Sequence, residues 1–207
     1  KEFDRLSTTV INSYVGPVLG RYLENLQERL TSYHQAGDFL IMQSNGGVAP
    51  IEDSRRLAVR SILSGPAGGV SGAAAYGRLA GTSNIIAFDM GGTSTDISLI
   101  ENGEPHLSTE KFEAGWKISV PMIDIHTMGA GGGSIASMGP GGIMQVGPES
   151  AGALPGPASY GKGGDRPTVT DANLALGYLD PGNFLGGSAK LDVSLAEQAV
   201  GEHVAQP

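Results

Sequence analysis

The chain has 207 residues, 40% of them hydrophobic and 16% charged, which suits one large or two small globular domains. No apolar run is long enough to span a bilayer, and no signal peptide opens the chain. Without cysteine it forms neither disulfides nor thiolate metal sites, which is consistent with a cytoplasmic location. The net charge is -8, and the acidic excess lies after Arg60, with six basic against fourteen acidic side chains. We therefore expect no nucleic-acid and no membrane partner.

Residues 1–80 are expected to form a helical segment, a strand and a connecting helix. Ser7 to Leu30 is predicted to be helical, with a break or restart at Gly16-Pro17. Asp38 to Ser44 is a predicted buried strand. It ends in Asn45-Gly46-Gly47, which is either a plain turn or a ligand contact.

The segment that follows leads into a helix of small residues. Glu52 to Leu57 is predicted as a short helix and Val59 to Leu63 as a short strand. Gly65 to Gly77 starts like a helix, although each glycine costs roughly 1 kcal/mol relative to alanine. We expect another backbone to approach this helix closely, because such an approach favours small residues.

Residues 81–207 are predicted to form a second part, built on a hairpin with a glycine turn. Ile85 to Phe88 is a buried-strand pattern, and Asp89 and two glycines follow it. Thr95 to Glu101 alternates like a returning strand and leads to Asn102-Gly103, a strong hairpin signal. Because a strand and not a helix follows the glycines, neither the Walker loop nor the dinucleotide fingerprint is satisfied. The hairpin could also be a Gly-Thr-rich turn of any antiparallel sheet.

Beyond the hairpin the composition changes. Short strands are predicted over residues 106–112, 117–120 and 122–125. Gly129 to Gly164 contains 13 glycines and four prolines, and we interpret it as an ordered, loop-rich wall. Thr168 to Leu179 is a predicted helix with Thr170 or Asp171 as its N-cap, and a capping box at Ser194–Glu197 opens a final helix.

Two resemblances extend this interpretation. The hairpin with an acid at each end of its turn resembles a phosphate hairpin of the sugar kinase, actin and heat-shock chaperone ATPases. Several blocks together resemble the hydantoinase A and 5-oxoprolinase family. These blocks are Ser7–Asn12, Met42–Gly47, Ser64–Val70, Gly129–Ala136, Val146–Ala153, Pro155–Ala158 and Thr168–Asn173.

The family resemblance implies an α/β, actin-like (ribonuclease H-like) ATPase lobe with a mixed sheet, flanking helices and a long Gly/Pro-rich loop region. It implies ATP in a cleft between two lobes, and opening of cyclic amides such as hydantoins or 5-oxoproline after phosphorylation of the amide oxygen. It also implies that the chain is a central fragment of the A subunit, working with a B-type partner subunit or domain in an oligomer. We expect this fragment alone to bind ATP weakly and to hydrolyse nothing.

The hairpin turn supplies the predicted nucleotide ligands. Asp89 would hold Mg²⁺, since a hard cation that bridges phosphate oxygens prefers carboxylate. Otherwise it caps its own turn. Donors to the β- and γ-phosphates would be Gly91, Gly92, Thr93 and Thr95. Asp96 either joins this site or closes the turn by a hydrogen bond.

Other candidates follow the hairpin. Asp124 and His126 lie two residues apart, so on a strand they would share a face and could act in catalysis by orienting water, holding a metal or contacting substrate. Otherwise they are structural. Gly131, Gly132 and Gly133 could form a second anion-binding nest. Glu149 is either a buried acid in a site or a carboxylate that satisfies loop amides.

Two alternatives to a cyclic-amide hydrolase stay open at this point. One is an ATP-dependent ketone carboxylase subunit, because relatives in the resembled family carboxylate ketones. The other is a nucleotide-binding module without chemistry of its own, acting through lobe closure as actin and chaperone ATPases do.

Overall fold

The computed structural model describes residues 2–33, 37–113 and 115–205, which divide into two compact units. The first unit comprises the described residues up to Phe88 together with Ile97–His126, and the second comprises Asp89–Asp96 and the described residues from Thr127 onward. This division differs from the predicted boundary at residue 80. The difference arises because the boundary lies inside the hairpin: described residues up to Phe88 belong to the first unit, residues Asp89–Asp96 to the second, and the chain re-enters the first unit at Ile97.

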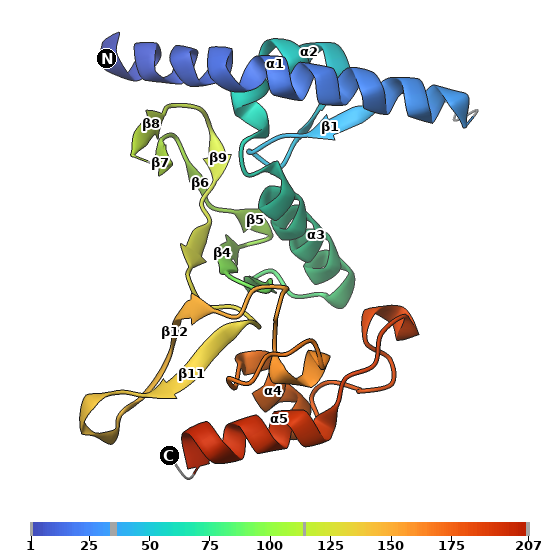
Figure 1. Cartoon of the computed structure of the whole chain (residues 1–207). Helices are drawn as coiled ribbons and strands as arrows, with labels where there is room; N and C mark the ends of the chain where they lie inside the picture. The colour runs from blue at the N-terminus through green and yellow to red at the C-terminus, as the bar shows by residue number, and fades with distance from the viewer. Residues whose placement is uncertain (1, 34–36, 114, 206–207) are drawn as a thin grey trace. The chain divides into compact units, whose positions relative to one another are not determined.

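The first unit begins with one long helix, α1 (Glu2–Ser32), drawn in blue in Figure 1. The predicted break at Gly16-Pro17 is wrong, because the helix continues through Pro17. A proline inside a helix costs about 3 kcal/mol. Contacts on both sides of the proline offset this cost. Before it, Asn12 accepts from the Val59 amide at 3.0 Å, and after it Leu23 is 1% exposed and Glu24 pairs with Arg55.

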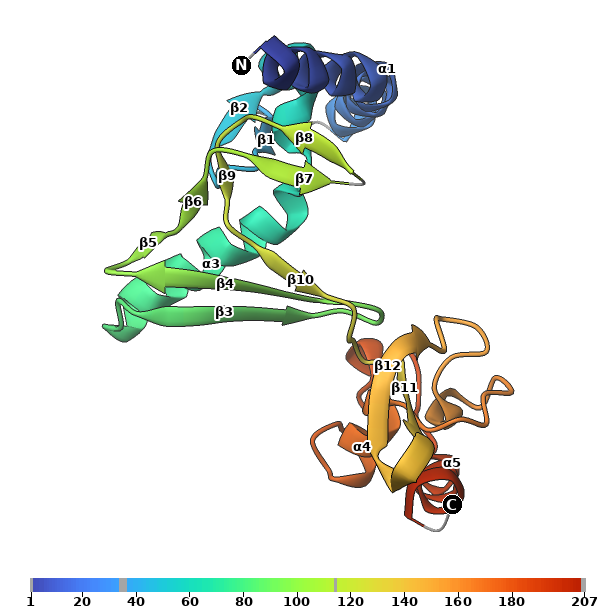
Figure 2. The ribbon, with the colours of Figure 1, turned by 90° about the vertical axis from the view of Figure 1, so that its left-hand side faces the viewer.

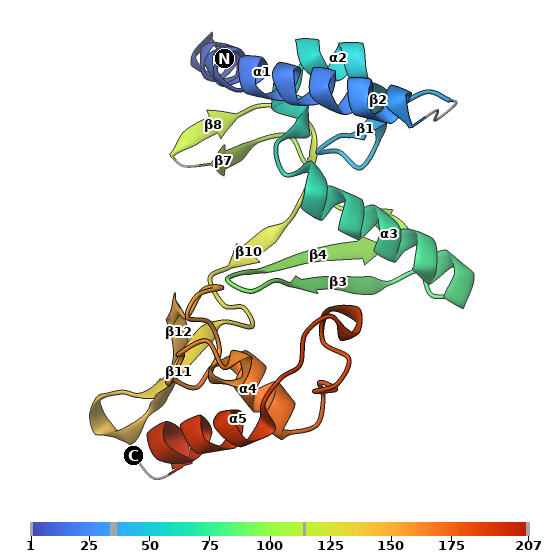
Figure 3. The same ribbon diagram turned by 45° about the vertical axis from the view of Figure 1, so that its right-hand side comes forward.

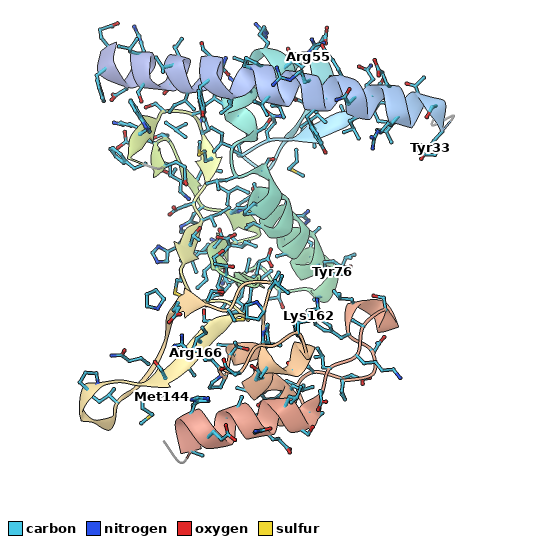
Figure 4. All side chains as sticks on the ribbon, in the orientation of Figure 1. Tyr33, Arg55, Tyr76, Met144, Lys162 and Arg166 are labelled. Carbon is cyan, nitrogen blue, oxygen red and sulfur yellow. The ribbon has the colours of Figure 1, made fainter. Side chains whose placement is uncertain are left out.

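A small hairpin and two short helical segments pack beside α1. The hairpin consists of β1 (Leu40–Met42) and β2 (Val48–Pro50), which pair antiparallel, and α2 (Ile51–Arg56) follows directly. Figure 4 shows Arg55 of α2 beside α1. The predicted strand at Val59–Leu63 is wrong, because Ala58–Ser61 forms a 3-10 helix. The Arg60 carbonyl of this 3-10 helix accepts hydrogen bonds from both the amide and the hydroxyl of Ser44.

The helix of small residues, α3 (Ser64–Ala80), covers one face of the main sheet, as Figure 3 shows. Its buried alanines and Val70 pack with Ile100, Ile123 and Ile125 in the main core. A close approach occurs at Gly77, where an added Cβ would lie 2.8 Å from the Thr82 carbonyl and 2.1 Å from the Ile85 Cδ1. It does not occur at Gly72, where nothing lies within 4 Å. The expected close packing therefore holds at one end of the helix.

The main sheet has the strand order β10-β4-β3, visible in Figure 2, with β5 pairing β4. The strands are β3 (Ile85–Met90), β4 (Thr95–Glu101), β5 (Glu104–Pro105) and β10 (His126–Met128). The predicted hairpin is present, and Asn102 and Gly103 turn with φ of 54° and 83°. Ile85–Phe88 is not buried on both faces, because Ile86 and Phe88 are exposed.

Two small antiparallel strand pairs complete the first unit. These pairs are β6 (Leu107–Ser108) with β9 (Met122–Ile123), and β7 (Lys111–Glu113) with β8 (Trp116–Ile118). Ile118 and Met122 pack with Val59 in a second core cluster. Lys117 of β8 pairs with Glu110 at 2.6 Å and with Asp4 of α1 at 3.3 Å, and these carboxylates, Glu110 first, raise its pKa.

The second unit contains a β-ribbon where a loop-rich wall was expected. Antiparallel strands β11 (Ser134–Met138) and β12 (Met144–Ser150) are joined by a 3-10 turn at Pro140–Gly142. Alternation in this segment is hidden by glycine and proline, so sequence periodicity did not reveal the strands. The part from Ala151 to Gly164 does run as loops with one 3-10 turn, Ala158–Tyr160.

Helices α4 (Val169–Ala175) and α5 (Val193–Val200) close the second unit around a cluster of Leu174, Leu191 and Ala196. A 3-10 turn, Leu185–Gly187, lies between them, and a π-helical turn, Gly201–Ala205, follows α5. Both predicted caps are wrong. Thr168 caps α4 and Asp192 caps α5, so Thr170, Asp171 and Ser194 lie inside the helices.

Candidate phosphate-binding site

The turn of the β3–β4 hairpin offers free backbone amides. It is closed by a hydrogen bond from the Gly91 amide to the Ser94 carbonyl at 2.9 Å. The amides of Gly92 and Thr93 donate to no group within the described residues, and both residues are exposed. Neighbouring free amides in a tight turn form an anion-binding concavity. The phosphate contacts of these two residues stay a prediction.

Asp89 stands at the end of β3, where its carboxylate is exposed and has no hydrogen bond or ion pair within the described part of the chain. It therefore does not cap its own turn, which was the structural alternative. Asp96 is half-buried at the start of β4 and accepts from the Thr127 hydroxyl at 2.6 Å, so it ties β4 to β10 and does not close the turn.

A glycine loop at residues 129–134 lies directly against the turn. The Gly132 amide donates to the Gly91 carbonyl at 2.9 Å, and the Gly133 amide donates to the Gly92 carbonyl at 2.6 Å. The Gly131 amide donates to the Ser134 hydroxyl at 2.8 Å. All three amides are therefore occupied inside the protein, and the structure gives these glycines a supporting place behind the turn, not the open nest that was expected.

Glycine is required in this loop because backbone atoms of the turn lie too close for a side chain. A Cβ added to Gly131 would lie 2.7 Å from the Thr93 nitrogen and 2.8 Å from the Gly91 oxygen. A Cβ added to Gly133 would lie 2.8 Å from the Gly92 oxygen. Real Cβ atoms do not approach backbone this closely, so only glycine lets the loop and the turn meet.

Thr95 also serves this contact. Its side chain is fully buried, and its hydroxyl donates to the Ala130 carbonyl. Because that donor is engaged, the structure does not present it for the predicted phosphate contact. Thr95 instead fixes the first residue of β4 to the glycine loop.

The first residues of α4 anchor the glycine loop. The amide and the hydroxyl of Thr170 both donate to the Gly132 carbonyl at 2.8 Å. Next to it the Asp171 carboxylate is fully buried and accepts from Thr168, both amide and hydroxyl, and from the amides of Ala158 and Ser159. Sequence reasoning missed this support, although the Thr168-x-x-Asp171 spacing is a capping-box signal.

Asp124 and His126 belong to the first unit. Both are exposed, and Ile125 between them is buried, which fits the predicted placement of the two side chains on one face. The Asp124 backbone is fixed by its amide, which donates to the His106 carbonyl, and by its oxygen, which accepts from Ser98. Neither side chain has a hydrogen bond or ion pair within the described residues. Their catalytic role stays a prediction.

Glu149 is neither a buried acid nor a ligand of loop amides. Its side chain is 65% exposed and pairs with Arg166 at 2.7 Å, in the region where Figure 4 labels Arg166. The Asn45-Gly46-Gly47 junction forms a turn: the Gly46 amide donates to the Gln43 carbonyl, and an added Cβ at Gly46 would lie 2.8 Å from the Ser71 hydroxyl. Its alternative role as a ligand contact stays a prediction.

The described residues hold neither a ready-made metal cluster nor a membrane-spanning helix. No group of three or more acidic, histidine or cysteine side chains gathers there as a metal site would require. A magnesium ion bound through one or two carboxylates and nucleotide phosphates needs no such cluster. Among the helices of residues 2–33, 37–113 and 115–205, none has the length and apolarity to cross a membrane.

The chain is similar to proteins that use ATP. The alpha subunit of caprolactamase from Pseudomonas jessenii is 47% identical to this chain, over all of this chain and 30% of the subunit's length. The crystal structure of the ATP-dependent caprolactamase from the same organism superposes on it with a TM-score of 0.82, over 97% of this chain and 29% of the crystallised chain. The 5-oxoprolinase of Saccharomyces cerevisiae is 44% identical over 89% of this chain and 14% of its own length. A nucleotide-free structure of acetone carboxylase is 34% identical, with a TM-score of 0.77 over all of this chain and 29% of its own.

These likenesses give the fold and the family. The chain spans about a third of the length of the caprolactamase subunit. Its fold is α/β and of the actin-like type that these structures share, as predicted. The model of the hydantoinase/oxoprolinase family matches residues 5–207. Since the match covers nearly the whole chain, the chain belongs to the hydantoinase/oxoprolinase family.

Proposed function

We propose that this chain is part of an ATP-dependent hydrolase that opens cyclic amides. ATP binds with its β- and γ-phosphates against the Gly92 and Thr93 amides, and the amide oxygen of the substrate is phosphorylated, so that water can attack its carbon and open the ring. The observation that carries the proposal is the hairpin turn with two free amides beside an unpaired, exposed Asp89. The similarity to an ATP-dependent caprolactamase and to a 5-oxoprolinase supports the substrate class.

Magnesium is the proposed metal, held by Asp89. Its carboxylate fits a hard cation that takes only one or two protein ligands and completes its shell with phosphate oxygens and water. When bound, the ion neutralises charge that develops on the transferred phosphoryl group. Asp89 is suited to this part because no protein donor within the described residues competes for its oxygens. Asp124 and His126 are the proposed catalytic pair.

The proposal includes a second subunit and a compartment. A relative of this chain is named an alpha subunit, which supports a B-type partner subunit or domain within an oligomer. The cytoplasm is the proposed location, since ATP is available there and the sequence contains no cysteine.

The test uses the complete natural polypeptide that contains this chain, together with the subunit that co-purifies with it. We expect it to open caprolactam, hydantoin or 5-oxoproline rings with stoichiometric ATP consumption. Asp89→Ala should lower this coupled turnover by at least about a hundredfold, because one metal ligand and its charge are lost. Unchanged turnover in Asp89→Ala would show that the phosphate site has been placed wrongly. Glu149→Ala, on the surface, is the control.

Ketone carboxylation is the second candidate, favoured by the similarity to acetone carboxylase over the whole chain. The same preparation should be offered acetone or acetophenone with bicarbonate and ATP. Carboxylation without ring opening would select this candidate. ATP binding without turnover of either substrate class would select a nucleotide-binding module.

A further inference from the structure

Thr170 lies outside the proposed phosphate site but is connected to it through peptide groups. Its side chain is buried, at 8% exposure, in the first turn of α4. Its amide and hydroxyl both donate to the Gly132 carbonyl at 2.8 Å. A carbonyl that accepts two hydrogen bonds belongs to a strongly polarised and well-fixed peptide group.

Hydrogen bonds connect that peptide group to the hairpin turn. The carbonyl of Gly132 and the amide of Gly133 belong to one peptide, and the Gly133 amide donates to the Gly92 carbonyl at 2.6 Å. The Gly92 carbonyl in turn shares its peptide with the Thr93 amide, which donates to nothing in the described part of the protein. The order is therefore Thr170, the Gly132–Gly133 peptide, the Gly92–Thr93 peptide, and then the free amide.

The other free amide is held by a separate contact with the glycine loop, which does not include Thr170. The Gly132 amide donates to the Gly91 carbonyl at 2.9 Å, and this carbonyl shares its peptide with the Gly92 amide. Both free amides thus belong to peptides whose oxygen is held by the glycine loop. In such chains each hydrogen bond polarises the next peptide and strengthens its N–H as a donor.

Thr170 is itself held rigidly. The capping box of Thr168 and Asp171 surrounds it, and the buried Asp171 carboxylate binds the amides of Ala158 and Ser159. An added Cβ on Gly132 would lie 2.8 Å from the Thr170 hydroxyl, so the loop has closed fully onto this residue. The anchor is therefore a fixed point in the second unit and not a surface contact.

We propose that Thr170 is a positioning residue for nucleotide binding, which orients and polarises the Thr93 amide toward phosphate through the glycine loop. The inference rests on the proposed function of the turn, and it adds a residue 77 positions away in sequence from Thr93. It assigns the hydroxyl of Thr170 to the affinity for the phosphates and not to the affinity for the rest of the nucleotide.

The test compares binding of ATP and AMP to the complete polypeptide by calorimetry. Thr170→Val keeps the shape and the amide but removes the hydroxyl donor, and we expect it to raise the Kd for ATP about three- to tenfold while the Kd for AMP stays the same. Thr170→Ser restores the hydroxyl and should return the Kd for ATP to within about twofold of the unmodified protein. If Thr170→Val does not fold, Thr170→Ala is measured in the same way.

Two comparisons make the outcome decisive. Asp192→Ala removes a cap in the same unit without touching the glycine loop, and it should leave the Kd for ATP unchanged. An unchanged Kd for ATP in Thr170→Val, or an equal loss of ATP and AMP binding, overturns the inference. Asp89→Ala is measured alongside: if it weakens ATP binding while Thr170→Val does not, the positioning role fails and the proposed function stands. If Asp89→Ala also binds ATP normally, the proposed site itself is wrong.

Discussion

Single residues in the glycine loop are fixed by distances that no larger side chain satisfies. Gly131, Gly132 and Gly133 each face another atom of the protein at less than 3 Å from where a Cβ would stand. Other glycines are different. Gly72 in α3 has open space around that position, so its lack of a side chain serves no contact within the described residues. The two kinds of glycine look alike in the sequence.

The contrast predicts opposite effects of the same substitution. Gly131→Ala should destabilise the second unit by about 1–3 kcal/mol, because backbone atoms at 2.7–2.8 Å must move apart. Gly72→Ala should stabilise α3 by up to about 1 kcal/mol, because alanine favours a helix interior. Urea midpoints followed by circular dichroism measure both. Equal changes in the two variants would contradict the packing of loop against turn.

At the scale of secondary-structure elements, helix caps are residues other than those that the sequence pattern predicted. The helix α5 is capped by Asp192, whose carboxylate accepts from the amides of Ser194 and Leu195. The Ser194 hydroxyl, first, and these amides lower the pKa of Asp192 below its ordinary value of 3.8. A carboxylate with a lowered pKa in the folded state stabilises the fold when it is ionised.

This cap gives α5 a pH dependence of known sign. The stabilisation is present above pH 3.8 and is lost as the pH falls below that value through the lowered pKa of the folded state. Asp192→Asn keeps a good neutral cap. The advantage of the unmodified chain over Asp192→Asn, measured as a difference in urea midpoint, should therefore shrink between pH 6 and pH 3. A difference that does not change with pH would show that the ionised carboxylate contributes nothing.

At the scale of the whole molecule, the charge distribution restricts which groups could bind phosphate at the proposed site. The stretches 79–110 and 118–161, which hold the turn and the glycine loop, contain no lysine or arginine, and the chain as a whole carries a net charge of -8. Within these stretches a tri- or tetra-anionic nucleotide would find only backbone amides and a bound cation to offset its charge.

The affinity for ATP should therefore depend on a divalent metal. We expect removal of Mg²⁺ with EDTA to raise the Kd for ATP of the complete polypeptide at least about tenfold, and added Mg²⁺ to restore it. Sodium at equal ionic strength is the control, because it screens charge without bridging phosphate oxygens. Equal affinity with and without Mg²⁺ would mean that basic side chains outside these stretches bind the phosphates.

The sequence by itself determined the hairpin, the helix of small residues and the family, and it singled out Asp89, Gly92 and Thr93 as candidates. Strand alternation, glycine turns and family motifs each depend on neighbouring residues, so they can be recognised without the tertiary structure. Only the tertiary structure decided which donors stay free. Thr95 and Gly131–Gly133 have the same residue types as phosphate ligands, but their donors are engaged by Ala130, the turn and Ser134. It also decided that α1 passes through Pro17 and that Thr170 supports the turn, because contacts between residues far apart in sequence outweigh local preference.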